Sequence, residues 1–267
     1  LILRLLSGTA NITHHYNDVE IRSRVNYFTS DFKPSFRDWG RDITSLISDD
    51  ITIQDLNTYL ERTKTINHGF YNAIISEISH FFVHTKRKSH TAAFIYIYRL
   101  LEKISYAFPV IYSQQTTDYI QTFSQLKDML SGKDKSELGF FKIFIKKLFE
   151  DSNLKDTSVD LNIEADTVEV QERIFNVMKN SCDEKIIHGD TDDPRRLSIN
   201  FCDFGSFIIS IRNKFFHYRN ESGNIDSDRV VDSDLFFKFM NKYSLQWICT
   251  IYVTILIHNL SDFQSRG

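Results

Sequence analysis

Glycine and proline are scarce in this sequence, with 9 and 3 residues in 267. This shortage argues against β-sandwiches, collagen-like repeats and low-complexity linkers, since all of these use frequent turns or a repeated Gly. Phenylalanine and tyrosine are abundant instead, with 23 and 12 residues. Hydrophobic residues make up 42% and charged residues 25%, which excludes wholesale disorder. The composition therefore predicts long helices packed around an aromatic core.

Cysteine is also rare. Cys182, Cys202 and Cys249 are far apart in the sequence and form no Cys-x-x-Cys pair. An odd number of cysteines at such spacing argues against both a disulfide scaffold and a structural zinc site. Free thiols are typical of a reducing compartment, so we expect a cytoplasmic protein.

The sequence lacks both an excess of positive charge and a long apolar run. Lys and Arg number 32 against 35 Asp and Glu, a net charge of −3. This excludes a strongly basic nucleic-acid-binding domain, but a local basic groove stays open. The apolar run 1–6 is too short for a signal-peptide core, and the longest run, 247–257, is shorter than the roughly 20 residues that span a bilayer. We expect no membrane association and interpret 247–257 as part of a buried helix.

From residue 51 onward, apolar residues recur at the three- and four-residue spacings typical of helices. Thr52 is a candidate N-cap, with Asp55 three residues later favouring the helix N-terminus. Residues 150–166 and 183–203 are predicted to be irregular. The predicted helices are one that follows Thr52 and includes Leu60, then 69–84, 89–108, 116–130, 136–149, 167–180, 204–220 and 232–261.

Residues 1–50 show no clear period. Within them, 25–28 and 43–47 are candidates for short strands or turns, while Pro34 and Gly40 interrupt the stretch. We therefore predict an all-α protein in two parts, a poorly patterned N-terminal extension at 1–50 and a helical domain at 51–267.

The segment 204–220 combines an apolar helical stripe with three polar residues, Arg212, Asn213 and His217. Asn213 and His217 are four residues apart, which places them on one face of a continuous helix. Arg212 is five residues before His217, and its side chain is long enough to reach the same pocket. The spacing predicts that the three groups converge near one helical turn. The stripe consists of Phe204, Phe207, Ile208, Ile211 and Phe215.

Arg, then Asn, three further residues, then His resembles the motif of HEPN domains. These are all-α domains of bacterial toxin–antitoxin, abortive-infection and CRISPR-associated proteins. The upstream segment 98–106 is similar to the HEPN helix whose polar residues face the motif. The resemblance covers residues 67–260 and implies a HEPN-like helical bundle. The supporting candidates that it adds are Arg99 and Glu102 in the upstream helix and Tyr218 and Arg219 after the histidine.

The resemblance implies RNA cleavage that needs no metal or cofactor and yields a 2′,3′-cyclic phosphate. It also implies a homodimer whose two motifs line one cleft, and a toxin or antiphage effector with an antitoxin or another defence-system protein as partner. The residue chemistry agrees. Histidine titrates near neutral pH and can act as base or acid, and arginine binds phosphate oxygens through its fork of N–H groups. Asn213 can orient His217 or hold a phosphate oxygen.

Simpler interpretations stand beside these. Arg212 can form a structural ion pair with Glu102, and Arg99 and Glu102 are spaced for an ordinary i,i+3 pair. Lys86, Arg87 and Lys88 are candidate contacts to RNA phosphate, or merely a solvated surface. His80 and His84 have a possible metal-ligand spacing but lack an acidic or Cys partner nearby, so we predict no metal site. The rival functions are a non-catalytic HEPN-like module that binds nucleic acid or nucleotide or scaffolds a defence complex, and a purely structural helical protein.

Overall fold

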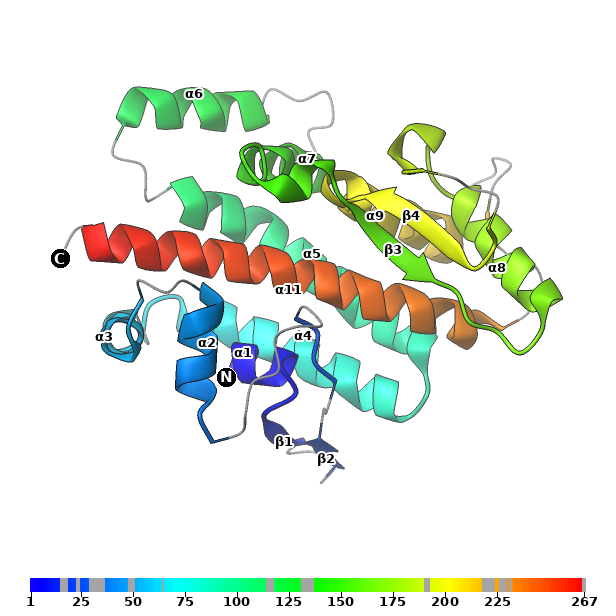
Figure 1. Ribbon diagram of the computed structural model, residues 1–267, viewed down its shortest axis with the longest axis horizontal. Helices are drawn as coiled ribbons and strands as arrows, with labels where there is room; N and C mark the ends of the chain where they lie inside the picture. Colours follow the sequence, from blue (N-terminus) through cyan, green and yellow to red (C-terminus); the bar gives the residue numbers. More distant parts are fainter. Residues whose placement is uncertain are drawn as a thin grey trace.

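The computed structural model describes residues 1–14, 19–22, 25–28, 37–47, 51–63, 65–113, 118–130, 137–189, 193–217, 224–225, 230 and 232–265. The fold is mostly helical, which confirms the predicted all-α class (Figure 1). The described helices are α1 (Ile2–Leu6), α2 (Trp39–Ile47), α3 (Ile53–Thr63), α4 (His68–Lys86), α5 (His90–Ser113), α6 (Tyr119–Leu130), α7 (Glu137–Leu148), α8 (Val168–Lys179), α9 (Phe204–Phe216) and α11 (Ser233–Ser265). Short 3₁₀ turns occur at η1 (Asn153–Asp156), η2 (Glu184–Ile186) and η3 (Phe201–Asp203).

Helices α5 and α11 form the centre of the molecule and lie side by side (Figure 1). Helix α4 packs along α5, and α7 and α9 cover the α5–α11 pair on the side away from α1 and α2 (Figure 1). The run 247–257 lies within α11, as predicted, and Trp247 is buried there. None of the helices in the described ranges is both long and apolar enough to span a bilayer.

Two short antiparallel pairs of strands accompany the helices. Strand β1 (Asn11–His14) pairs with β2 (Val19–Arg22), and β3 (Ser158–Asn162) pairs with β4 (Arg196–Asn200). The second pair lies in the two segments that we predicted to be irregular, so that prediction is wrong there. Strands β3 and β4 are each five residues long, and they lie more than thirty residues apart in the sequence. The alternation of apolar residues is therefore too short to stand out from a loop.

The first fifty residues contribute to the core. Leu5 and Leu6 of α1 are buried in the main hydrophobic cluster, as is Tyr27. The stretch 43–47 belongs to helix α2, so the predicted strand or turn is wrong there. A second, smaller cluster joins this region to the rest of the chain. Its buried members are Leu3, Ile43, Ile51, Leu56 and Leu260. The domain boundary at residue 50 stays a prediction.

Several helix ends agree with the sequence. Thr52 Oγ1 accepts a hydrogen bond from Asp55 N–H (3.1 Å), and Thr52 N–H donates to Asp55 Oδ2 (2.9 Å), which confirms the predicted cap of α3. Thr167 Oγ1 accepts from Val170 N–H at the start of α8. Two ends differ, because α5 continues four residues beyond Pro109 and α9 ends at Phe216 rather than at residue 220.

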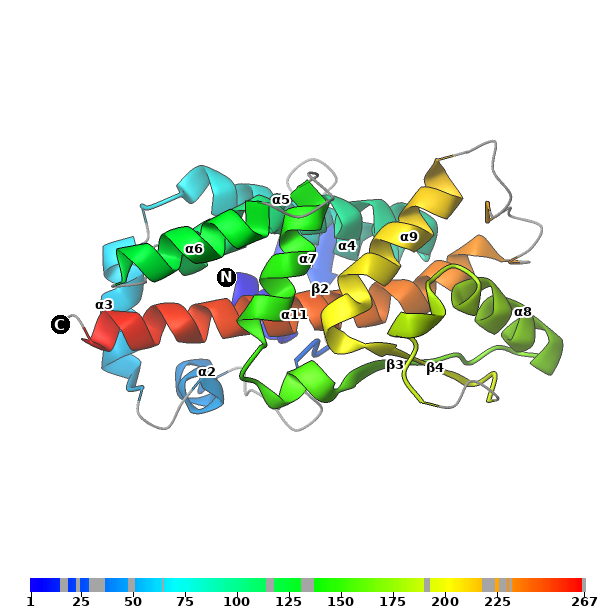
Figure 2. The same cartoon turned by 90° about the horizontal axis from the view of Figure 1, so that it is seen from above.

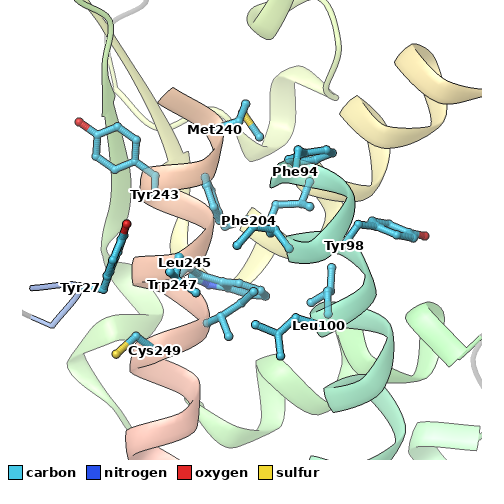
Figure 3. Packing of buried hydrophobic residues seen from close by; sticks show 14 of the residues in the cluster. Tyr27, Phe94, Tyr98, Leu100, Phe204, Met240, Tyr243, Leu245, Trp247 and Cys249 are labelled. Carbon is cyan, nitrogen blue, oxygen red and sulfur yellow. The ribbon is translucent and has the colours of Figure 1, made fainter. Parts of the chain in front are cut away.

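The packing of α9 on α11 centres on Trp247, whose indole points from α11 toward α5 (Figure 3). Its Nε1–H donates to the carbonyl oxygen of Phe201 at 2.9 Å. Gly205, in the first turn of α9, lies against the indole, and a Cβ there would stand 2.8 Å from Trp247 Cη2. Glycine at this position therefore allows α9 to approach α11 closely.

Candidate functional site

The predicted motif occupies the C-terminal end of α9. The apolar stripe of this helix is buried from Phe204 to Ile211, whereas Arg212, Asn213 and Phe215 in its last turn are half-buried. His217 is the C-cap residue and is exposed, and its N–H donates to the carbonyl oxygen of Asn213 at 3.2 Å. Its backbone is extended, with φ −114° and ψ 102°. The side chain of His217 thus leaves from the helix end, so helical spacing does not set its direction relative to Asn213.

Arg212 is held by two contacts. Its Nη1–H donates to Asn213 Oδ1 at 3.0 Å. Its guanidinium carbon lies 4.4 Å from the centre of the Tyr98 ring, a cation–π contact with α5. Guanidinium has five N–H donors, and one of them is bonded to a side chain in the part of the chain that the structure describes. The remaining donors can bind an oxyanion.

Tyr98 is the residue at this site that the sequence analysis did not nominate. It is only 7% exposed, and its ring lies on the side of α5 away from α11 (Figure 3), where it meets Arg212 of α9. Burial raises the pKa of Tyr98, the Arg212 charge opposes this rise, and the Glu102 charge adds to it. The phenol is therefore neutral at physiological pH. The signal in the sequence was a Tyr and a Glu four residues apart, which share one face of a helix.

The ion pairs of α5 differ from those predicted. Arg99 Nη2 lies 3.0 Å from Glu77 Oε1 of α4, and Lys103 Nζ lies 3.5 Å from the same oxygen. The predicted i,i+3 pair of Arg99 with Glu102 is therefore replaced by a pair between helices. Successive helical residues point about 100° apart, so Tyr98 faces α9 while Arg99 faces α4.

Glu102 does not form the predicted structural pair either. Within the described ranges, no ion pair joins it to Arg212, whose guanidinium lies on Tyr98 instead. Among the described residues, Glu102 acts on the site through its charge near Tyr98. Tyr218 and Arg219 lie outside the described residues.

The basic segment Lys86, Arg87 and Lys88 forms the exposed turn between α4 and α5, as expected for cations at a helix C-terminus. Lys86 Nζ donates to the carbonyl oxygen of Glu20 at 2.7 Å.

One turn into α5, Phe94 stacks on Phe216, the residue before His217, with ring centres 6.2 Å apart. The start of α5 and the end of α9 are thus close, at the end of the molecule where α11 begins (Figure 2).

His80 and His84 both stack on the ring of Tyr96, with centroid distances of 5.0 and 5.2 Å. Across the described part of the chain, no three His, Cys, Asp or Glu side chains come together in a metal-binding arrangement. The three cysteines are free, and burial raises the pKa of Cys182 to about 11, which leaves it a poor nucleophile at neutral pH.

The chemistry available at the end of α9 is a fixed guanidinium, a carboxamide bonded to it and an exposed imidazole. Together these groups can bind a phosphate oxygen and exchange a proton. No protein-family model matches the sequence, and comparison with curated proteins and with solved structures finds no match.

Proposed function

We propose that this chain is a metal-independent endoribonuclease of HEPN type. The observation that carries the proposal is the position of Arg212 over Tyr98, bonded to Asn213, on the helix whose C-cap is the exposed His217. A phosphate-binding cation with donors to spare and a titratable group occupy one helix end. These are the two groups that RNA cleavage without a metal requires.

In the proposed reaction, His217 takes the proton of a ribose 2′-OH, whose oxygen attacks the adjacent phosphorus. Arg212 donates hydrogen bonds to the non-bridging phosphate oxygens, where negative charge develops. The bond to the 5′-oxygen breaks, and that oxygen receives a proton. The products are a 2′,3′-cyclic phosphate and a 5′-OH.

The second proton transfer is the reason for proposing a homodimer. One histidine per motif serves one transfer and must be reprotonated to serve another. A two-fold interface places the same patch of each subunit face to face, so the His217 of one chain acts as base and that of the other as acid. Phe216, within the motif and 37% exposed, is an apolar side chain that such an interface would bury. Light scattering tests this, because a mass near that of one chain, 31.4 kDa, at micromolar concentration contradicts it.

We further propose that the enzyme acts in the cytoplasm as a toxin or antiphage effector, held in check or triggered by a partner protein. Basic side chains of the α4–α5 turn, Lys86, Arg87 and Lys88, are proposed to contact RNA phosphates outside the reacting bond. These parts of the proposal rest on the HEPN resemblance.

The test uses purified protein and total RNA in EDTA. We expect cleavage to persist in EDTA and to disappear in Arg212→Ala and His217→Ala with the circular dichroism spectrum unchanged. Exposed residues of the same types provide matched controls, Arg173→Ala and His188→Ala, which should retain cleavage. If both motif variants cleave at the wild-type rate, the assignment is wrong. RNA binding without cleavage in the wild type supports the non-catalytic module instead.

The pH profile of the rate is a separate test. With one imidazole neutral and the other protonated, the rate should be bell-shaped between roughly pH 5 and 9. A rate that rises steadily with pH and needs added Mg²⁺ contradicts the mechanism and indicates a metal-activated water.

A further inference from the structure

A cavity of about 310 Å³ lies on the other side of the α5–α11 pair from Arg212. Figure 3 shows this arrangement, with Tyr98 pointing away from α5 on one side and Tyr27 and Tyr243 lying beside α11 on the other. The wall is formed by the end of α4, the start of α5, the first turns of α11 and the residues around the end of β3. Its aromatic members are Tyr27, Phe81, Phe239 and Tyr243.

Three buried polar atoms belong to side chains that line this cavity. Asn241 is 2% exposed, and its Nδ2–H donates to the carbonyl oxygen of His90 at 2.8 Å, which fixes the amide orientation. Asn241 Oδ1, His90 Nδ1 and Thr85 Oγ1 have no hydrogen-bond partner among the residues that the structure describes. Buried polar groups are normally paired, and three unpaired ones around a single cavity are unusual. A ligand with hydrogen-bonding groups would satisfy them.

The cavity mouth carries positive charge. Lys238 and Lys242 are exposed and four residues apart on α11, so both ammonium groups lie on one side of the helix. Lys242 Nζ also lies 5.0 Å from the centre of the Tyr243 ring. Glu164 is the one carboxylate among the described lining residues, so the mouth has a net charge of about +1. Burial lowers the pKa of His90, which keeps its imidazole neutral and available as an acceptor or a donor.

These features of the cavity lining indicate the chemical class of its ligand. The unpaired Asn241 Oδ1 requires a donor, the four aromatic side chains suit a flat ring, and two ammonium groups suit a dianion at the mouth. The volume is at the small end of the range for ligand sites, which fits a single small molecule rather than a polymer.

We propose that this cavity binds a small aromatic phosphate monoester of the purine nucleoside monophosphate class. The ring lies among the aromatic side chains and donates an N–H to Asn241, while the phosphate binds Lys238 and Lys242. The site is separate from the α9 motif, and the proposal does not depend on the ribonuclease assignment.

Isothermal titration calorimetry with AMP and GMP tests the proposal, with the nucleosides and inorganic phosphate as further probes. We expect at least one nucleotide to bind, and its nucleoside and phosphate alone to bind at least tenfold more weakly. Lys238→Glu and Lys242→Glu should each weaken nucleotide binding at least tenfold, and the matched charge reversal Lys127→Glu on α6 should not. No heat with either nucleotide at millimolar concentration overturns the proposal. So does equal affinity for nucleoside and nucleotide, or equal binding by all three lysine variants.

Thr85→Val gives a second test, in which the affinity for the nucleotide should fall while the stability of the protein does not. Without ligand, its unfolding temperature should be at least as high as that of the wild type, because the variant removes a buried hydroxyl that has no described partner. Its affinity for the nucleotide should nevertheless fall several-fold. Lower stability together with unchanged affinity would show that the hydroxyl serves the fold and not a ligand, and would overturn its role in the site.

Discussion

Replacing Gly205 with alanine should destabilise the protein through a clash with Trp247. The new Cβ would lie 2.8 Å from Cη2 of the indole, about 0.6 Å closer than the 3.4 Å at which ordinary contact begins. The indole has little room to move, since it is 2% exposed and its Nε1–H is bonded to the Phe201 carbonyl. The rings of Phe141 and Phe204 also border it. The strain must therefore be relieved by moving α9 away from α11.

The magnitude follows from two opposing effects. Overpacking a core of this kind costs about 1–3 kcal/mol. Alanine recovers about 0.5–1 kcal/mol of helix propensity relative to glycine, and less in the first turn, where Gly205 lies. We expect a net loss of about 1–2 kcal/mol in the free energy of unfolding. For a chain of this size, the unfolding temperature should fall by about 2–8 °C.

Urea denaturation followed by circular dichroism measures the loss, and a double-mutant cycle identifies its cause. Trp247→Phe removes the atom that would clash, so Gly205→Ala should be neutral or stabilising in that background. The coupling energy should then be at least about 1 kcal/mol. A Gly205→Ala protein as stable as the wild type, or an equal loss in both backgrounds, refutes the reasoning.

Three further predictions concern single contacts. Thr52→Ala should cost about 1 kcal/mol of stability, because it removes the hydroxyl that caps α3; an unchanged urea midpoint contradicts this. Burial raises the pKa of Asp160, but hydrogen bonds from Ser198 and Ser158 and the Arg196 charge outweigh it and hold this pKa below 3.8. Asp160→Asn should therefore destabilise the protein at pH 7, and should do so progressively less as the pH falls through that lowered pKa. An equal loss in urea midpoint at pH 7 and at about pH 2 contradicts the coupling between the ionisation of Asp160 and the stability of the protein. Tyr98→Leu should slow RNA cleavage about 2- to 30-fold by removing a cation–π contact worth about 0.5–2 kcal/mol, while Tyr98→Phe should not; equal rates in both variants contradict a positioning role.

The sequence predicted α4 and α5 well because each buries one side along most of its length. In α4, Ile74, Ile78 and Phe81 follow the helical period and are buried. Helix α2 was missed because its described buried residues are only Ile43 and Thr44, too few to reveal a period. Strand β3 was missed because Leu161 is its one fully buried residue.

The site was predictable only in part. The adjacency of Arg212 and Asn213 follows from the motif, and their hydrogen bond agrees with it. The partners of α5 were not predictable, because Tyr98 meets Arg212, and Arg99 meets Glu77, through the packing of helices that are distant in sequence. The position of His217 depends on where α9 ends. Hydrophobic periodicity locates the ends of a helix less well than its middle.

Helix α11 has a consequence for folding during synthesis. It completes both hydrophobic clusters, with Trp247 in one and Leu260 in the other. Its contacts with the start of α5 join residues 143 and 151 positions apart, from Asp234 to Thr91 and from Asn241 to His90. A nascent chain that has not yet produced α11 must leave uncovered the part of α5 that packs on α11, a state that favours collapsed intermediates and chaperone binding. We therefore expect the surroundings of Arg212 to become ordered only after α11 has been synthesised.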